Sequence, residues 1–120
     1  MIDPLMIGLF APISRAATEV AAFAYLDAGG RLLALRHVPS GEALRVEVAI
    51  RTIAGDALAF RADLVVMAHN HPSGDAEPSR DDLMATGRIA TALEALGIRL
   101  VDHLVLAGDA RTSLRARGLI

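Results

Sequence analysis

An unbroken apolar segment, residues 64–68, runs directly into a polar loop that carries two histidines. Five consecutive apolar residues are typical of a strand that is covered on both faces, as strands inside an α/β sheet are. The loop that follows contains Pro72 and Gly74, which favour a turn and end the strand. The sequence therefore predicts an internal strand that carries its histidines to one edge of a sheet.

The segments around this strand predict an α/β domain. The expected elements run strand, strand, strand, helix, strand, helix, strand, over residues 19–27, 31–38, 44–46, 48–60, 64–68, 80–96 and 98–106. This order predicts a single-domain mixed β-sheet flanked by helices. We expect residues 1–18 to be an N-terminal lead-in, with Ser14 as a helix cap, residues 19–120 to form the domain, and residues 112–120 to end it as a short helix or turn.

Length and composition exclude several classes of protein. The 120 residues are enough for one domain with one hydrophobic core. The apolar runs are too short for a membrane helix, which needs roughly 20 residues, and no basic region precedes a long apolar stretch at the start. We therefore expect a soluble, cytoplasmic protein with no membrane partner. Because the chain has no Cys, a metal must be held by His, carboxylates or water.

His69 and His71 lie two residues apart at the end of the predicted strand, so both side chains can point to the same side. Two such imidazoles suggest a metal, and a catalytic zinc ion takes three protein ligands and leaves one position for water. Asp82, on the first turn of the helix that follows Ser79, is our choice for the third ligand. Ser79 and Asp82 are also a capping box. We expect that one carboxylate scarcely serves fully as both cap and ligand.

The loop and the helix start together resemble the JAMM motif in its RadC-type form. The matching residues are His69-Asn70-His71-Pro72-Ser73-Gly74, then Pro78-Ser79 and Asp82. The resemblance extends from about Glu19 to the C-terminus and includes Tyr25-Leu26-Asp27, Asp102-His103 and Arg117-Gly118-Leu119. It implies a RadC-like JAB/JAMM (MPN+) domain over residues 19–120, with the JAMM/MPN-like architecture that is also described as cytidine-deaminase-like.

The same resemblance implies a set of site residues: zinc on His69, His71 and Asp82, Ser79 assisting a developing oxyanion, and an upstream glutamate as general base. Glu19, at the start of the first predicted strand, fits the position of the base, and Glu42 and Glu47 are weaker alternatives. The implied activity is that of a zinc peptidase or isopeptidase acting on a peptide or protein. Zinc is preferred over manganese or iron by ligand type and by the resemblance.

Two other functions stay open. RadC-type proteins have an old association with DNA repair, and Arg111, Arg115 and Arg117 offer a weak basis for nucleic-acid binding in a chain of net charge −2. A non-catalytic interaction scaffold is the third hypothesis, and the complete ligand set argues against it. Asp102-His103 either orients a ligand imidazole or has a structural role. Larger RadC-type proteins carry an N-terminal helical region that we do not find here, so the substrate and oligomeric state are not predicted.

Overall fold

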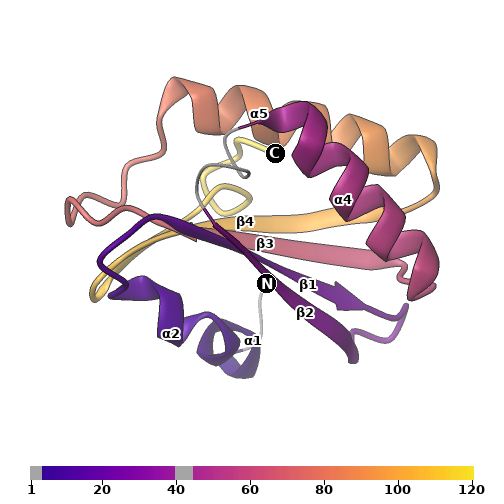
Figure 1. Cartoon of the computed structure of the whole chain (residues 1–120), viewed down its shortest axis with the longest axis horizontal. Coiled ribbons are helices and arrows are strands. Elements are labelled where there is room, and N and C mark those ends of the chain that lie inside the picture. Colours follow the sequence, from indigo (N-terminus) through magenta and orange to yellow (C-terminus); the bar gives the residue numbers. More distant parts are fainter. Residues whose placement is uncertain (1–3, 40–44) are drawn as a thin grey trace.

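Five strands form one mixed sheet in the computed structural model, which describes residues 4–39 and 45–120 (Figure 1). The strands are β1 (Val20–Leu26), β2 (Leu32–Pro39), β3 (Leu64–Asn70), β4 (Arg99–Ala107) and β5 (Ala110–Ser113). Their order across the sheet is β2-β1-β3-β4-β5, and only β3 and β4 run parallel to one another. The predicted α/β class with a mixed sheet is confirmed.

Helices cover both faces of this sheet (Figure 1). The longer helices, α4 (Val46–Ala59) and α5 (Arg80–Ala95), pack on one face. The short helices α1 (Pro4–Leu9) and α2 (Ala11–Ser14) lie on the other, where Phe10 and Ile13 are buried against the strands. None of the helices within the described residues combines the length and the apolar character needed to cross a bilayer.

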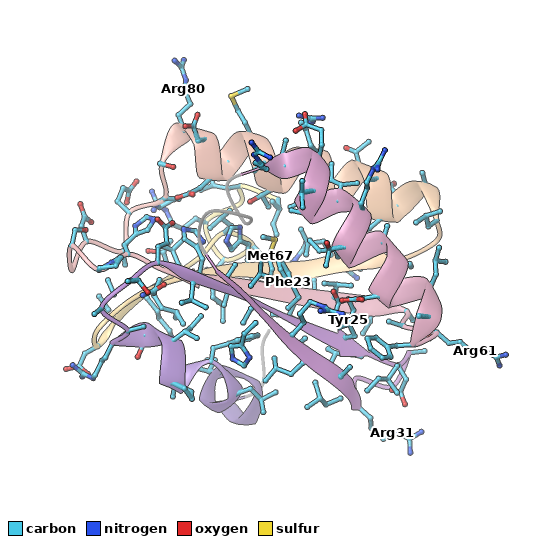
Figure 2. All side chains as sticks on the ribbon, viewed as in Figure 1. Phe23, Tyr25, Arg31, Arg61, Met67 and Arg80 are labelled. Atoms are coloured by element: carbon cyan, nitrogen blue, oxygen red, sulfur yellow. The ribbon has the colours of Figure 1, made fainter. Side chains whose placement is uncertain are left out.

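Side chains of the central strands point alternately to the two faces of the sheet, so the core consists of two layers, one on each face. Phe23, Tyr25 and Met67 point from β1 and β3 toward the long helices (Figure 2). Their neighbours in the sequence pack toward the short helices, which explains why residues 64–68 are apolar without interruption. Because His69 follows Met67 by two residues, its side chain emerges on the α5 face of the sheet.

One extra residue in β4 changes which side chains share that face. Val65 pairs with Leu100 but Val66 pairs with Asp102, so the residue between them has no partner of its own. In a regular strand Leu100 and His103, three residues apart, would point to opposite faces. The irregularity places His103 opposite Met67, on the same face as His69.

Most predicted elements are present, and the differences lie at their ends. The expected hairpin is confirmed, with the Asp27 carboxylate accepting hydrogen bonds from the turn. The expected strand over 44–46 is wrong in its described part, because Arg45 is the residue before α4 and Val46 begins that helix. Residue 44 lies outside the described residues. Ser14 is the last residue of α2 and caps no following helix. The strand β5, which overlaps the first two residues of the expected C-terminal helix or turn over 112–120, was not predicted.

Candidate metal centre

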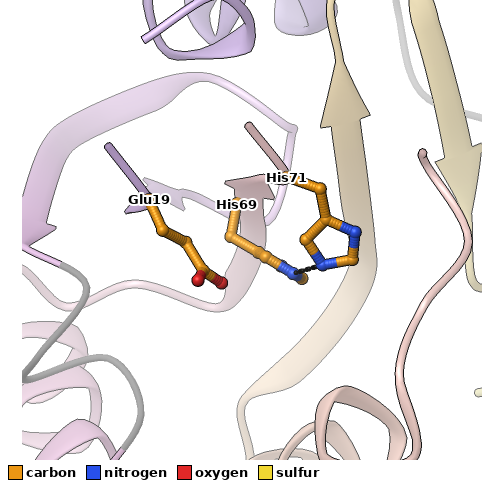
Figure 3. A group of neighbouring side chains, drawn as sticks. All are labelled: Glu19, His69 and His71. Carbon is orange, nitrogen blue, oxygen red and sulfur yellow. Dashed lines mark hydrogen bonds between the residues drawn. The ribbon is translucent and has the colours of Figure 1, made fainter. Parts of the chain in front are cut away.

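Three segments that are distant in the sequence meet at the end of β3. They are the residue before β1, the end of β3 itself and the first turn of α5. Figure 3 shows the side chains of Glu19, His69 and His71 gathered there. One carboxylate oxygen and two imidazole nitrogens of these residues lie within 4.8 Å of one another. His69 is buried, whereas Glu19 and His71 are half-buried, so the group is reachable from solvent.

Asp82 brings a second carboxylate to the two imidazoles. Its Oδ1 lies 3.3 Å from Nε2 of His69, and its Oδ2 lies 3.2 Å from Nε2 of His71. The two Nε2 atoms are themselves 2.9 Å apart. Ligand atoms around a tetrahedral zinc ion, at bond lengths of about 2.0–2.2 Å, are about 3.3 Å from one another. The type and the spacing of these three donors therefore fit a zinc ion.

Asp82 holds the start of α5 at the same time. Its Oδ2 accepts a hydrogen bond from the backbone N–H of Ser79 at 2.8 Å, and its own N–H donates to Oγ of Ser79 at 3.0 Å. This is a complete capping box. An ionised carboxylate accepts about four hydrogen bonds or ligand bonds, so capping leaves lone pairs free toward the histidines. The capping box and the approach of the Asp82 carboxylate to both histidines are thus present in one structure.

The charge state of Asp82 suits a cation. Burial raises the pKa of its carboxyl, but the neighbouring His69 imidazole and the hydrogen bond from the backbone N–H of Ser79 outweigh burial. The pKa of Asp82 is therefore held below its ordinary value. The group is an anion at neutral pH, facing two imidazole nitrogens.

The loop after β3 fixes the orientation of His71. Nδ1 of His71 is 2.9 Å from the carbonyl oxygen of Asp75. Because a carbonyl oxygen only accepts hydrogen bonds, the proton of a neutral His71 is on Nδ1 and the lone pair is on Nε2. That lone pair faces Asp82. Gly74, at a φ of +91°, makes the turn that brings the Asp75 carbonyl back to the ring.

Asn70, the residue between the two histidines, points to the other face and anchors the segment that carries Glu19. Its Oδ1 accepts a hydrogen bond from the Val20 N–H at 2.6 Å, and its Nδ2 donates to the carbonyl oxygens of Ala16 and Thr18 at 3.2 and 2.9 Å. Asn70 is fully buried. No role was predicted for Asn70, although a polar residue that alternates with the histidines at the end of an apolar strand was a signal for one.

His103 and Asp102, neighbours on β4, have separate partners. Nε2 of His103 is 2.6 Å from Nδ1 of His69. Burial and the nearby His69 lower the pKa of His103 to about 3, so the ring is neutral. Asp102 accepts hydrogen bonds from the backbone N–H groups of His103 and Arg115 and from the Ser113 hydroxyl. Asp102 therefore holds the C-terminal segment, and His103 alone contacts a candidate ligand.

The remaining candidates lie away from this cluster or outside the described residues. Glu42 lies outside the described residues. Glu47 is exposed on α4, where it pairs with Arg88 at 3.2 Å.

The arginines near the C-terminus make contacts within the domain. Arg115 donates to the carbonyl oxygens of Leu100 and Val101, and Arg117 pairs with Glu77 at 2.9 Å. Two of the three arginines considered for nucleic-acid binding are thus engaged within the chain.

Comparison with known proteins gives a consistent family. A family profile described as "RadC-like JAB domain" matches residues 6–119. The UPF0758 protein of Albidiferax ferrireducens is 40% identical over 102 residues, which are 85% of this chain and 44% of that protein. UPF0758 protein BAV2405 of Bordetella avium is 41% identical over 96 residues, 80% of this chain and 43% of the relative. The corresponding protein of Cellvibrio japonicus is 41% identical over 110 residues, 92% and 49% respectively. The chain spans about half the length of these relatives.

Proposed function

Because the chain belongs to the RadC-like JAB domain family, we propose that it is a zinc-dependent hydrolase of peptide or isopeptide bonds. One observation carries the proposal. Two imidazole nitrogens and the Asp82 carboxylate lie within 3.3 Å of their neighbours, and a carboxylate oxygen of Glu19 lies within 4.8 Å of a nitrogen of each imidazole. The arrangement would supply three ligands for a metal and a separate base.

His69, His71 and Asp82 would hold the ion. Zinc in such a site would act as a Lewis acid, which lowers the pKa of a bound water molecule to about 7 and polarises a carbonyl group. The protein contributes two neutral imidazoles and one carboxylate, so the bound ion would keep a net positive charge. That charge favours an electron-rich substrate oxygen.

Glu19 would move the proton. Its carboxylate is half-buried and close to both imidazoles, a position from which it can accept a proton from an attacking water molecule. The amine that leaves when an amide is cleaved needs a proton, and the same carboxyl group can return it. This requirement supports an amide or isopeptide as the substrate bond.

Ser79 would stabilise the charge that develops on the carbonyl oxygen. Its Oγ accepts a hydrogen bond from the Asp82 N–H, which fixes the hydroxyl beside the ligand cluster. Within the described part of the chain, the hydroxyl proton has no protein acceptor, so it can donate to a substrate oxygen.

A small hollow beside the cluster supports access of a substrate. Glu19, His69, Asp82 and His103 line one part of it. The rest is lined by apolar residues of β1, β3, α4 and α5: Ala21, Phe23, Ala49, Met67, Ala85 and Ile89. Polar donors at one end of an apolar hollow are the usual composition of a small-ligand site.

Metal content and hydrolysis together test the proposal. Protein purified without added metal or a His tag is expected to contain about one zinc ion per chain, the stoichiometry of a single three-ligand site. With a library of quenched fluorescent peptides and isopeptides, Glu19→Gln is expected to keep the metal and to lose about a hundredfold to ten-thousandfold in kcat. Glu47→Gln, an exposed position on α4, serves as the control and should behave as wild type. A wild-type protein that binds no zinc even when zinc is supplied, or a fully active Glu19→Gln variant, would contradict the proposal.

A further inference from the structure

A buried chain of hydrogen bonds runs behind the candidate ligands, from one of them to another. Nδ1 of His69 is 2.6 Å from Nε2 of His103. Nδ1 of His103 is 2.6 Å from Oγ1 of Thr86, and that oxygen is 2.6 Å from the carbonyl oxygen of Asp82. Thr86 and His103 are 0% and 3% exposed, so water does not supply alternative partners. The protons in this chain must therefore be shared among its members.

The carbonyl oxygen of Asp82, at the end of this row of hydrogen bonds, fixes the direction of every hydrogen bond in it. A carbonyl oxygen only accepts, so the Thr86 hydroxyl donates its one proton to Asp82. Oγ1 of Thr86 can then only accept, and the proton of a neutral His103 is on Nδ1. Nε2 of His103 is left with a lone pair, which accepts the Nδ1–H of His69. The consequence is that Nε2 of a neutral His69 carries a lone pair and lies 3.3 Å from Oδ1 of Asp82. Two such acceptors cannot hydrogen-bond to one another, but both can bind a cation placed between them.

We propose that His103 and Thr86 are positioning residues that hold His69 in the form that binds a metal. Histidine ligands usually donate their second N–H to a carboxylate, a carbonyl or water. Here a second imidazole takes that place, and a threonine fixes its tautomer. Because these hydrogen bonds end on the backbone of Asp82, they also tie the first turn of α5 to β3 and β4. They thereby set the distance between His69 and Asp82. The inference rests on the proposed metal site.

The tautomers can be observed without any activity assay. The protein has only four histidines, and His37, which is exposed, provides an internal reference. In long-range ¹H–¹⁵N spectra of metal-free protein, at a pH where the rings are neutral, we expect His69, His71 and His103 to be protonated at Nδ1. In Thr86→Val we expect His103 to lose this single tautomer. A wild-type His103 protonated at Nε2 would overturn the proposal.

Zinc affinity provides the second readout, measured by competition with a chromophoric chelator. Thr86→Val, which keeps the shape of the side chain, is expected to weaken zinc binding about tenfold to a hundredfold. Thr86→Ser, which keeps the hydroxyl, should restore most of the affinity. Thr91→Val is the matched control, because Thr91 makes the same bond to the carbonyl of the residue four before it on α5, at 2.9 Å, but is exposed.

The outcomes separate this inference from the proposed function. A wild-type protein that binds no zinc contradicts both. A wild-type protein that binds zinc, with Thr86→Val binding equally well, overturns the positioning role alone. The tautomers of the wild type decide the matter even if Thr86→Val does not fold.

Discussion

Oδ2 of Asp82 accepts a hydrogen bond from the backbone N–H of Ser79 at 2.8 Å, and the same oxygen lies 3.2 Å from Nε2 of His71. The start of α5 and the candidate metal centre therefore share one carboxylate. A change at either residue affects a helix terminus and a ligand set, but to different degrees.

Asp82→Asn and Ser79→Ala should separate these two effects. The asparagine amide can still accept the Ser79 N–H, so metal-free Asp82→Asn is expected to stay within about 1 kcal/mol of wild type in unfolding free energy. It should nevertheless lose zinc, because a neutral amide replaces the anionic ligand. Ser79→Ala should retain zinc and lose about 1 kcal/mol, the usual cost of removing an N-cap. Urea unfolding and metal analysis of both variants check the pair; the reverse pattern would refute the shared role.

Zinc should stabilise the folded chain through the histidines. At a free zinc concentration of about 100 times Kd, binding adds about 2.7 kcal/mol to the unfolding free energy of wild type. His71→Ala should show no such gain, since it lacks one ligand. Thermal unfolding with zinc, and again after excess chelator, measures the difference. An equal rise of Tm in His71→Ala would place the ion elsewhere.

Asn70→Ala should release the segment before β1. The change removes one hydrogen bond that the Asn70 side chain accepts and two that it donates, at a fully buried position. We expect a loss of roughly 2–4 kcal/mol in unfolding free energy, because three partly buried hydrogen bonds, each worth about 1 kcal/mol, are lost. Asn70→Asp keeps the acceptor for Val20 and should show faster amide hydrogen exchange at residues 16–19 but not at Val20. Unchanged exchange in both variants would contradict the anchoring role.

Tyr25 makes stability depend on alkaline pH. Burial, together with the adjacent Asp56 carboxylate that accepts a hydrogen bond from its hydroxyl at 3.0 Å, raises the pKa of Tyr25 well above its ordinary value. The folded state thus favours the protonated phenol. Its contribution to stability is complete below the unfolded pKa of about 10, and it is lost as the pH rises toward the folded value, by up to about 1.4 kcal/mol per pH unit.

Tyr25→Phe tests this dependence. The variant should be about 1 kcal/mol less stable than wild type at neutral pH, where the hydrogen bond is lost, but its stability should not fall with this slope above pH of about 10. The chain has one tyrosine and no lysine, so phenolate absorbance and the pH slope report on the same group. Equal slopes in both proteins would show that other groups cause the alkaline loss.

Local signals in the sequence predicted that His69, His71 and Asp82 come together, left the role of His103 open and gave no indication of Thr86. His69 and His71 end a strand that is apolar on both faces, and Asp82 follows a helix cap, so each belongs to a recognisable local pattern. His103 reaches the site only because β4 contains an extra residue, and that irregularity depends on pairing with β3 rather than on the composition of β4. The strand β5 was missed for a related reason, since four residues with exposed and half-buried side chains carry no clear alternation.

The hydrogen bonds of Asn70 also have an entropic consequence. They tie Ala16, Thr18 and Val20 to β3, and Glu19 lies among these residues. Fixing the backbone of a residue costs about 1–2 kcal/mol in conformational entropy. Here that ordering takes place once, when the chain folds, and is not repeated each time a ligand arrives. The carboxylate of Glu19 is therefore preorganised by a side chain on the opposite face of the sheet.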